Sequence, residues 1–174
     1  MKKGFTLLEL LVVVSIFAIV LSITFTFFSG LLSQTNKINI ETEVKQNGQI
    51  VVELLSRQIR NAINASNPGS PPNLTTLELI NQQGQINSFT CVFVAGQNGY
   101  IEDTTKSLSI TNQDDRNGVS LSDCRLEVRE SLISGAPKVV EITLTFQQAV
   151  NAPSRADFTA NAEFRQTISL RNYQ

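Results

Sequence analysis

The pattern of hydrophobic and polar positions divides the chain into two unlike parts. Residues 5–32 are almost continuously apolar, and Glu9 is their only charged member. The 23 residues from 10 to 32 carry no charge. As a helix rising about 1.5 Å per residue they would span roughly 35 Å, which covers a bilayer hydrocarbon core of about 30 Å. We therefore predict a transmembrane helix over residues 5–32.

From residue 33 the pattern becomes amphipathic. Apolar side chains recur at spacings of three, four and seven, which is the periodicity of a helix with one buried face. The stretch has no Pro before Pro68, and Gly48 is its only interior Gly. We assign residues 33–66 as an amphipathic continuation and predict a single helix from Phe5 to about Asn64, roughly 90 Å long. Its stripe should pack against the rest of the chain, with a coiled-coil partner as the alternative. The stripe consists of Ile40, Val44, Val51, Leu54, Leu55, Ala62 and Ile63.

Residues 67–174 have the pattern of a strand-rich head domain. The segment 67–73, NPGSPPN, is a loop by its turn chemistry. Alternating runs then predict strands over 74–80, 88–95, 107–111, 122–130, 138–148 and 160–170. Asn117-Gly118 is a hairpin turn signal. The predicted fold class is α+β, with a long N-terminal helix packed against an antiparallel β-sheet.

Composition excludes several kinds of chemistry. The chain has 174 residues, a mass of 19.2 kDa and no His. Without an imidazole, Ser-His-Asp catalysis, Cys-His catalysis and most zinc sites are excluded. We expect no enzyme, no cofactor and no metal site. The net charge of −1 gives no bulk attraction to polyanions, so no nucleic-acid partner is predicted.

The N-terminus predicts the orientation in the membrane. Lys2 and Lys3 precede the apolar run, and that run is too long for an ordinary cleaved signal peptide. The positive-inside rule places the two lysines in the cytoplasm. We expect a single-pass protein of the cytoplasmic (inner) membrane, with its head domain outside.

Glu9 is the unusual residue of the apolar run. A carboxylate inside an apolar membrane helix costs on the order of 3 kcal/mol, and such residues often have a function and a partner. The alternative is that Glu9, about one turn inside, reaches interfacial water and has no function.

The first fourteen residues carry a resemblance to a known family. Residues 4–14 read GFTLLELLVVV behind a leader of Met1-Lys2-Lys3-Gly4. This closely resembles the class III signal of type IV pilins and pseudopilins. The resemblance implies a leader over residues 1–4, cleavage between Gly4 and Phe5 by prepilin peptidase, and N-methylation of Phe5. It also implies an intersubunit assembly role for Glu9, which would meet the N-terminal amine of a neighbouring subunit.

Two further stretches look like one group within that family. Residues 51–62, VVELLSRQIRNA, and 164–172, FRQTISLRN, resemble W-type minor pilins and the J-type pseudopilin of type II secretion. Arg57, Arg60 and Arg171 lie in these stretches, and we assign them no individual function. The resemblance implies a pilin fold and a minor pilin-like subunit that helps to initiate or cap a type IV pilus. A type II secretion pseudopilin is the alternative, and a bitopic membrane-anchored binding module is an alternative of another class.

The same resemblance implies the partners. They are other pilin or pseudopilin subunits, prepilin peptidase and an inner-membrane assembly platform. Membrane lipid surrounds the helix before assembly, and a pilus or pseudopilus fibre holds it afterwards.

Cys91 and Cys124 lie in expected strands of the external head. An even count in an oxidising compartment favours a disulfide, and two buried free thiols are the alternative. The segment 112–118, NQDDRNG, is not a calcium loop, because an EF-hand alignment would put Gln113 and Cys124 where carboxylates are needed. We expect a solvated hairpin tip there.

Overall fold

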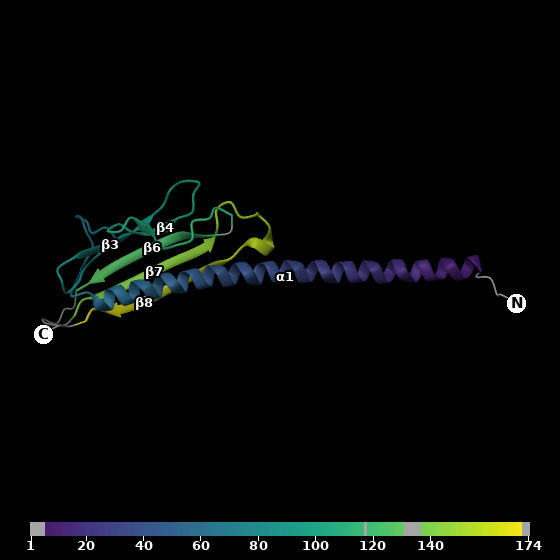
Figure 1. The fold of residues 1–174 in the computed structure, drawn as a ribbon, viewed down its shortest axis with the longest axis horizontal. Coiled ribbons are helices and arrows are strands. Elements are labelled where there is room, and N and C mark those ends of the chain that lie inside the picture. Colours follow the sequence, from purple (N-terminus) through teal and green to yellow (C-terminus); the bar gives the residue numbers. More distant parts are fainter. Residues whose placement is uncertain (1–5, 117, 131–136, 172–174) are drawn as a thin grey trace.

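A long helix dominates the computed structural model, which describes residues 6–116, 118–130 and 137–171. This helix, α1, runs continuously over Leu7–Asn61, 55 residues. Figure 1 shows it as a rod whose C-terminal half lies along the head and whose N-terminal half extends away from it. Because the first Pro is Pro68, no proline interrupts its hydrogen bonding. The predicted long helix is confirmed.

The head contains two antiparallel sheets, so the predicted α+β class is confirmed. The five-stranded sheet has the order β1-β2-β3-β4-β5 and the three-stranded sheet the order β6-β7-β8. The first sheet comprises β1 (Asn64–Ser66), β2 (Thr76–Ile80), β3 (Ile86–Val92), β4 (Tyr100–Asp103) and β5 (Leu108–Ser109). The second comprises β6 (Val119–Arg129), β7 (Val139–Gln148) and β8 (Asn161–Ser169), and the short 3-10 helix η1 (Ala156–Phe158) precedes β8.

The core forms where β7 and β8 lie against α1. Strand β7 alternates strictly, so that one face is fully buried and the other is half-buried. Its buried members are Val140, Ile142, Leu144 and Phe146. They meet a helix stripe with a period of three to four residues, as the amphipathic pattern predicts. The buried residues of α1 are Val44, Gly48, Val51, Leu55, Ser56 and Ile59.

The helix ends at Asn61, three residues before the predicted end. Ala62 adopts an extended backbone, and its N–H still donates to the carbonyl of Ile59 at 3.1 Å. The next residue, Ile63, donates its N–H to the Ile80 carbonyl at 2.8 Å. Pairing with β2 therefore replaces the last helical turn, and residues 64–66 of the segment assigned as helix form β1.

Six strands were predicted and all six are present within a few residues, but β1 and β4 were missed. Strand β1 has the sequence NAS, whose residue types are uncommon in strands. Strand β4, YIED, is only four residues long. Its buried carboxylate, Asp103, is paired with Lys106 at 3.1 Å. Because an acidic residue occupies a buried position in so short a strand, the sequence does not show the alternation of apolar and polar residues that would predict a strand.

The hairpin predicted at Asn117-Gly118 is wrong in its connectivity. Asn117 lies outside the described residues. The strands on either side, β5 and β6, belong to different sheets. The turn signal therefore marks a passage between sheets, closed by the Gly118 N–H donating to the Asp114 carbonyl at 2.9 Å.

Gly48 sets how closely α1 approaches β8. A Cβ at this position would overlap the ring of Phe164. That ring is held on its other side by an edge-to-face contact with Phe146, with ring centroids 6.1 Å apart. Gly48 makes a coiled-coil partner for this stretch of the helix less favourable. The same absence of a side chain lets the Phe164 ring pack directly against the helix.

We expect Gly48→Ala to destabilise the head, although Ala is the better helix former. The helix gains about 1 kcal/mol from the exchange, but overpacking costs typically 1–3 kcal/mol or more when the neighbour cannot move freely. Thermal unfolding of the detergent-solubilised chain should show a lower midpoint. Gly30→Ala is the matched control, because nothing lies within 4 Å of its added Cβ. If Gly48→Ala were as stable as the parent, the close approach would have no structural role.

Candidate processing and assembly site

The first turn of α1 is capped by hydrogen bonds between Thr6 and Glu9. The Glu9 N–H donates to Thr6 Oγ1 at 3.3 Å, and the Thr6 N–H donates to Glu9 Oε2 at 3.5 Å. This reciprocal arrangement is a capping box, and it places the carboxylate at the positive end of the helix dipole. The structure thus gives Glu9 a partner within its own chain, which offsets part of the cost of an apolar environment.

The predicted cleavage residues Gly4 and Phe5 lie outside the described residues, so cleavage and methylation stay predictions. A cut between them would leave a positively charged amine on Phe5, next to Thr6. Glu9 then has two candidate partners, which are its own first turn and the amine of a neighbouring subunit. Its intersubunit role also stays a prediction.

The side chains of residues 6–32 are all exposed in the single chain. Leu7 and Phe25 reach 82% and 80% exposure. An 18-residue window of this helix has a mean hydropathy of 2.7 and no buried residue, so length and composition allow it to cross a membrane. An apolar surface of this size is expected to be covered by lipid or by other helices.

The hydroxyl groups of this segment do not oppose burial in lipid. Each hydroxyl group between residues 7 and 32 donates to a carbonyl three or four residues earlier, at 2.7 to 2.9 Å. The donors are Ser15, Ser22, Thr24, Thr26 and Ser29. Because their polar groups are satisfied within the helix, they can enter a bilayer at small cost.

Cys91 and Cys124 form a disulfide between the two sheets. Cys91 lies on β3 and Cys124 on β6, with a Cα–Cα distance of 6.4 Å. Both side chains belong to the hydrophobic core. The predicted bridge is therefore present, and it joins the two sheets across their shared core.

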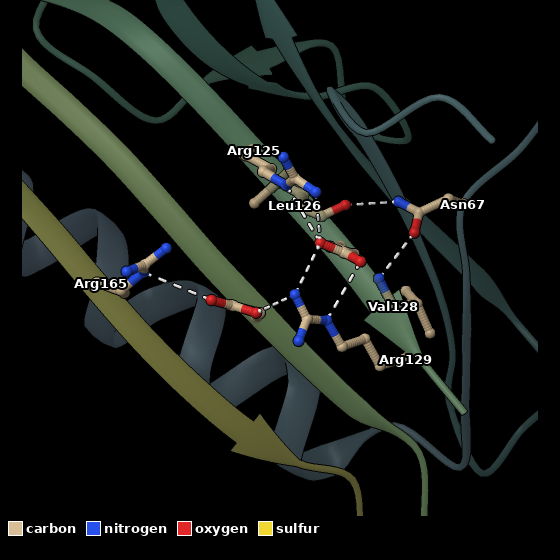
Figure 2. Close-up of polar contacts among 8 residues, drawn as sticks. Asn67, Arg125, Leu126, Val128, Arg129 and Arg165 are labelled. Atoms are coloured by element: carbon tan, nitrogen blue, oxygen red, sulfur yellow. Dashed lines mark hydrogen bonds and ion pairs between the residues drawn. The ribbon is translucent and has the colours of Figure 1, made fainter. Parts of the chain in front are cut away.

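A ladder of charged side chains crosses the face of the three-stranded sheet that points away from α1 (Figure 2). Arg129 contacts two carboxylates, with Nε 3.2 Å from Glu127 Oε1 and Nη2 2.8 Å from Glu141 Oε2. Arg125 contacts Glu127 at 2.8 Å, and Arg165 contacts Glu141 at 3.4 Å. Three guanidinium groups thus surround two carboxylates across β6, β7 and β8.

The arginines of the ladder offset the repulsion between two carboxylates on neighbouring strands. Glu127 and Glu141 are direct cross-strand partners, and like charges in such a pair repel. Hydrogen bonds from Arg129, and then from Arg125, hold the pKa of Glu127 below its usual range. The same contact with Glu127 raises the pKa of Arg129.

The lowered pKa of Glu127 predicts a pH effect on stability. A carboxyl whose pKa is lower in the folded state stabilises the fold above its unfolded pKa of about 4.3, and this contribution is lost as pH falls through the folded pKa. Chemical unfolding between pH 7 and pH 3 should therefore show a smaller acid loss in Glu127→Gln than in the parent. Arg129→Ala should reduce the acid loss too, since it removes the largest cause of the shift. An unchanged acid dependence in both variants would contradict this assignment.

Asn67 ties the loop after β1 to the edge of β6. Its Nδ2 donates to the carbonyls of Leu126 at 2.7 Å and Thr76 at 2.8 Å, and its Oδ1 accepts from the Val128 N–H at 2.8 Å. Figure 2 shows this amide bridging Leu126 and Val128 beside the ladder. The sequence identifies the NPGSPPN loop but not this contact, since the partners lie about 60 residues away.

The remaining predicted positions form no site of their own. Arg57 pairs with Glu53 at 3.6 Å on exposed α1, and Arg60 is exposed in the last turn. Within the described ranges, no group of three or more His, Cys, Asp or Glu residues could hold a metal ion. The chemistry of the described chain is thus concentrated in the first helical turn, the disulfide and the charged ladder.

Comparison with known proteins bears on the N-terminal segment. Residues 1–25 match the family model of the prokaryotic N-terminal methylation motif. No curated protein and no solved structure gives a significant match to the chain. Together with the long apolar helix, the motif indicates a membrane-anchored protein. The chain therefore carries, at its N-terminus, the class III signal of the type IV pilins and pseudopilins.

Proposed function

We propose that this chain is a minor pilin-like structural subunit of a type IV pilus, processed by prepilin peptidase. One observation carries the proposal. A single helix bears the methylation motif at one end, exposes its apolar residues over 7–32, and packs its other half into a head domain. This arrangement suits a subunit that is first held by lipid and later held by the helices of other subunits.

The transfer from bilayer to fibre is physically reasonable for this helix. Its apolar surface would exchange lipid for similar helices, so no apolar surface needs to face water. Cleavage would remove Lys2 and Lys3, which hold the end in the cytoplasm, and would create the amine on Phe5. In a low dielectric, a Glu9 carboxylate would attract that amine of a neighbour strongly. One cut would thus release the subunit and create the partner charge.

The finer assignment is a subunit that helps to initiate or cap the fibre. It rests on the resemblance of residues 51–62 and 164–172 to minor subunits. A minor pseudopilin of type II secretion uses the same helix and the same processing, so it is the alternative. The head would face outside the inner membrane and then the fibre surface.

Deletion of the gene distinguishes the two candidates. For a pilus subunit, we expect few or no surface fibres, normal protein secretion, and rescue by the full chain but not by a chain lacking residues 5–32. The chain itself should be present in sheared fibres at a low ratio to the major subunit. Normal fibres with a loss of secretion would favour the pseudopilin.

A further inference from the structure

The loop between β7 and β8 is the part of the head that reaches furthest toward the apolar half of α1 (Figure 1). We call this segment, residues 149–160, the η1 loop, because it contains η1. Phe164 of β8 lies beside Gly48 of α1. Further along both elements, Ser56 bonds to Gln166 at 2.7 Å. Strand β8 therefore runs in the same direction as α1, and the loop that precedes it lies toward the N-terminal end of the helix.

The η1 loop packs on α1 just beyond the apolar run. Phe158 and Ile40 line one groove between loop and helix. Thr159 and Lys37 line a second groove on the same stretch of helix. The helix and η1 are also in direct contact. The tip of the head is thus held on the first turns of α1 that follow the predicted span.

The height of this contact above the bilayer core follows from the helix. If residues 10–32 fill the hydrocarbon core, the headgroup layer extends about 5 to 8 Å beyond Leu32. Lys37 follows Leu32 by five residues, which is about 7.5 Å along a helix. Ser33 and Asn36, the first residues of α1 that are not fully exposed, lie within this layer. The η1 loop therefore begins at the height of the lipid headgroups.

The helix also fixes that height. It is continuous over Leu7–Asn61, so the predicted span and the support of the head form one rod. The uncharged run of about 35 Å is longer than a core of about 30 Å, and such a span fits by tilting. A tilt toward the head brings the η1 loop deeper into the headgroup layer.

The surface of the η1 loop suits a membrane interface. Pro153 and Ala156 are exposed, and Val150 is 44% exposed. The guanidinium of Arg155 lies over the ring of Phe158, 6.0 Å from its centroid. A side chain with an apolar body and a charged end can place the body among lipid and the end in water.

The charges at this end of the head do not favour anionic lipid. Within the loop and on the turn of α1 beside it, two basic and two acidic residues balance. These are Lys37, Arg155, Glu41 and Asp157. Further from the membrane, the segment 112–116 is tied to the loop by the Asn151 N–H, which donates to the Asp115 carbonyl at 3.1 Å. That segment and α1 add Asp114, Asp115, Glu43 and Arg116. Mixed charge of this kind matches the phosphate and ammonium groups of a zwitterionic headgroup.

We propose that the η1 loop is a second membrane contact, which lies in the headgroup layer on the head's side and binds zwitterionic phospholipid headgroups. The contact holds the head at a fixed height and a fixed rotation about α1. It must be released when the chain leaves the bilayer. The inference rests on membrane anchoring, but on neither processing nor a fibre, so it can fail without affecting the proposed function.

Fluorescence can test the contact because the chain has no Trp. Ala156→Trp places a reporter on the η1 loop. Gln83→Trp is the matched control, because Gln83 is exposed in the turn after β2. That turn lies at the far end of α1, where the Ile63 N–H donates to the Ile80 carbonyl. In nanodiscs that hold one full chain in phosphatidylcholine, headgroup nitroxides should quench Ala156→Trp at least about threefold more than Gln83→Trp. Equal quenching would overturn the proposal.

A longer helix separates the height of the loop from the affinity of the reporter for membranes. Duplication of residues 33–39 adds seven residues, raises the head by about 10.5 Å and turns it by only about 20°. The added segment should leave thermal unfolding of the head unchanged. In this background, quenching of Ala156→Trp should fall to the level of Gln83→Trp. Undiminished quenching in the lengthened chain would overturn the proposal.

The last arm identifies the occupant. Replacement of about a third of the phosphatidylcholine by phosphatidylglycerol should leave the quenching of Ala156→Trp unchanged, since the loop has no excess of positive charge. Quenching that required the anionic lipid would overturn the zwitterionic assignment. A blue shift of the emission that occurred only in discs with two copies would assign the loop to a neighbouring subunit, and would also overturn the proposal.

Discussion

Glu9→Leu should insert into the membrane at least as well as the parent, yet fail to enter fibres. The substitution removes an intramembrane charge that costs on the order of 3 kcal/mol. Processing should be unaffected, because Gly4 and Phe5 are unchanged. If the carboxylate attracts the amine of a neighbouring Phe5, loss of the charge should reduce recovery in sheared fibres at least about tenfold. The measurement is recovery of the variant in sheared fibres alongside its cleavage.

Glu9→Gln separates the charge from the capping box. Gln keeps the length of the side chain and can still accept from the Thr6 N–H. A capping role alone therefore predicts near-parental incorporation for Glu9→Gln, whereas pairing with an amine predicts loss in both variants. Full incorporation of Glu9→Leu would contradict the intersubunit role and would leave the cleavage prediction standing.

Removal of the disulfide should produce the largest loss of stability in the head. Cys91 on β3 and Cys124 on β6 join two sheets that also share one hydrophobic core. Closing a loop of this length contributes roughly 3 to 4 kcal/mol in the chain-entropy model. Chemical unfolding of the detergent-solubilised Cys91→Ala/Cys124→Ala chain should show a loss of about that size.

Hydrogen exchange can locate the effect of this loss. The five-stranded sheet should become less protected, while β7 and β8 should stay protected because they pack directly on α1. The parent chain after reduction is the control and should resemble the double variant. A loss below about 1 kcal/mol would show that core packing alone joins the two sheets.

Local patterns in the sequence predicted the parts of the fold that depend on a long, regular period. The uncharged run from 10 to 32 and the stripe through Val44 and Leu55 lie in one helix, as their lengths and spacings require. The alternation around Ile142 locates β7 to within one residue. The resemblance at residues 4–14 led to the same motif that the family model matches.

The parts that could not be predicted depend on contacts between distant residues. In the sequence alone, Gly48 is only a residue that weakens a helix. Its role depends on contact with Phe164, which lies over a hundred residues later in the chain. In the sequence, Glu127 and Glu141 look like unrelated acidic residues. Only the register between β6 and β7 places them opposite each other. The position of β8 at the edge of its sheet follows from the order of the strands, which the alternation of residues along the sequence cannot give.

The intact mass of the chain recovered from sheared fibres tests the central claim most directly. Prepilin peptidase processing predicts a chain that lacks residues 1–4 and carries one methyl group on Phe5. N-terminal sequencing of the same sample should give no residue from the leader. A chain that retains Met1 in cells with active prepilin peptidase would contradict the assignment as a pilin-like subunit.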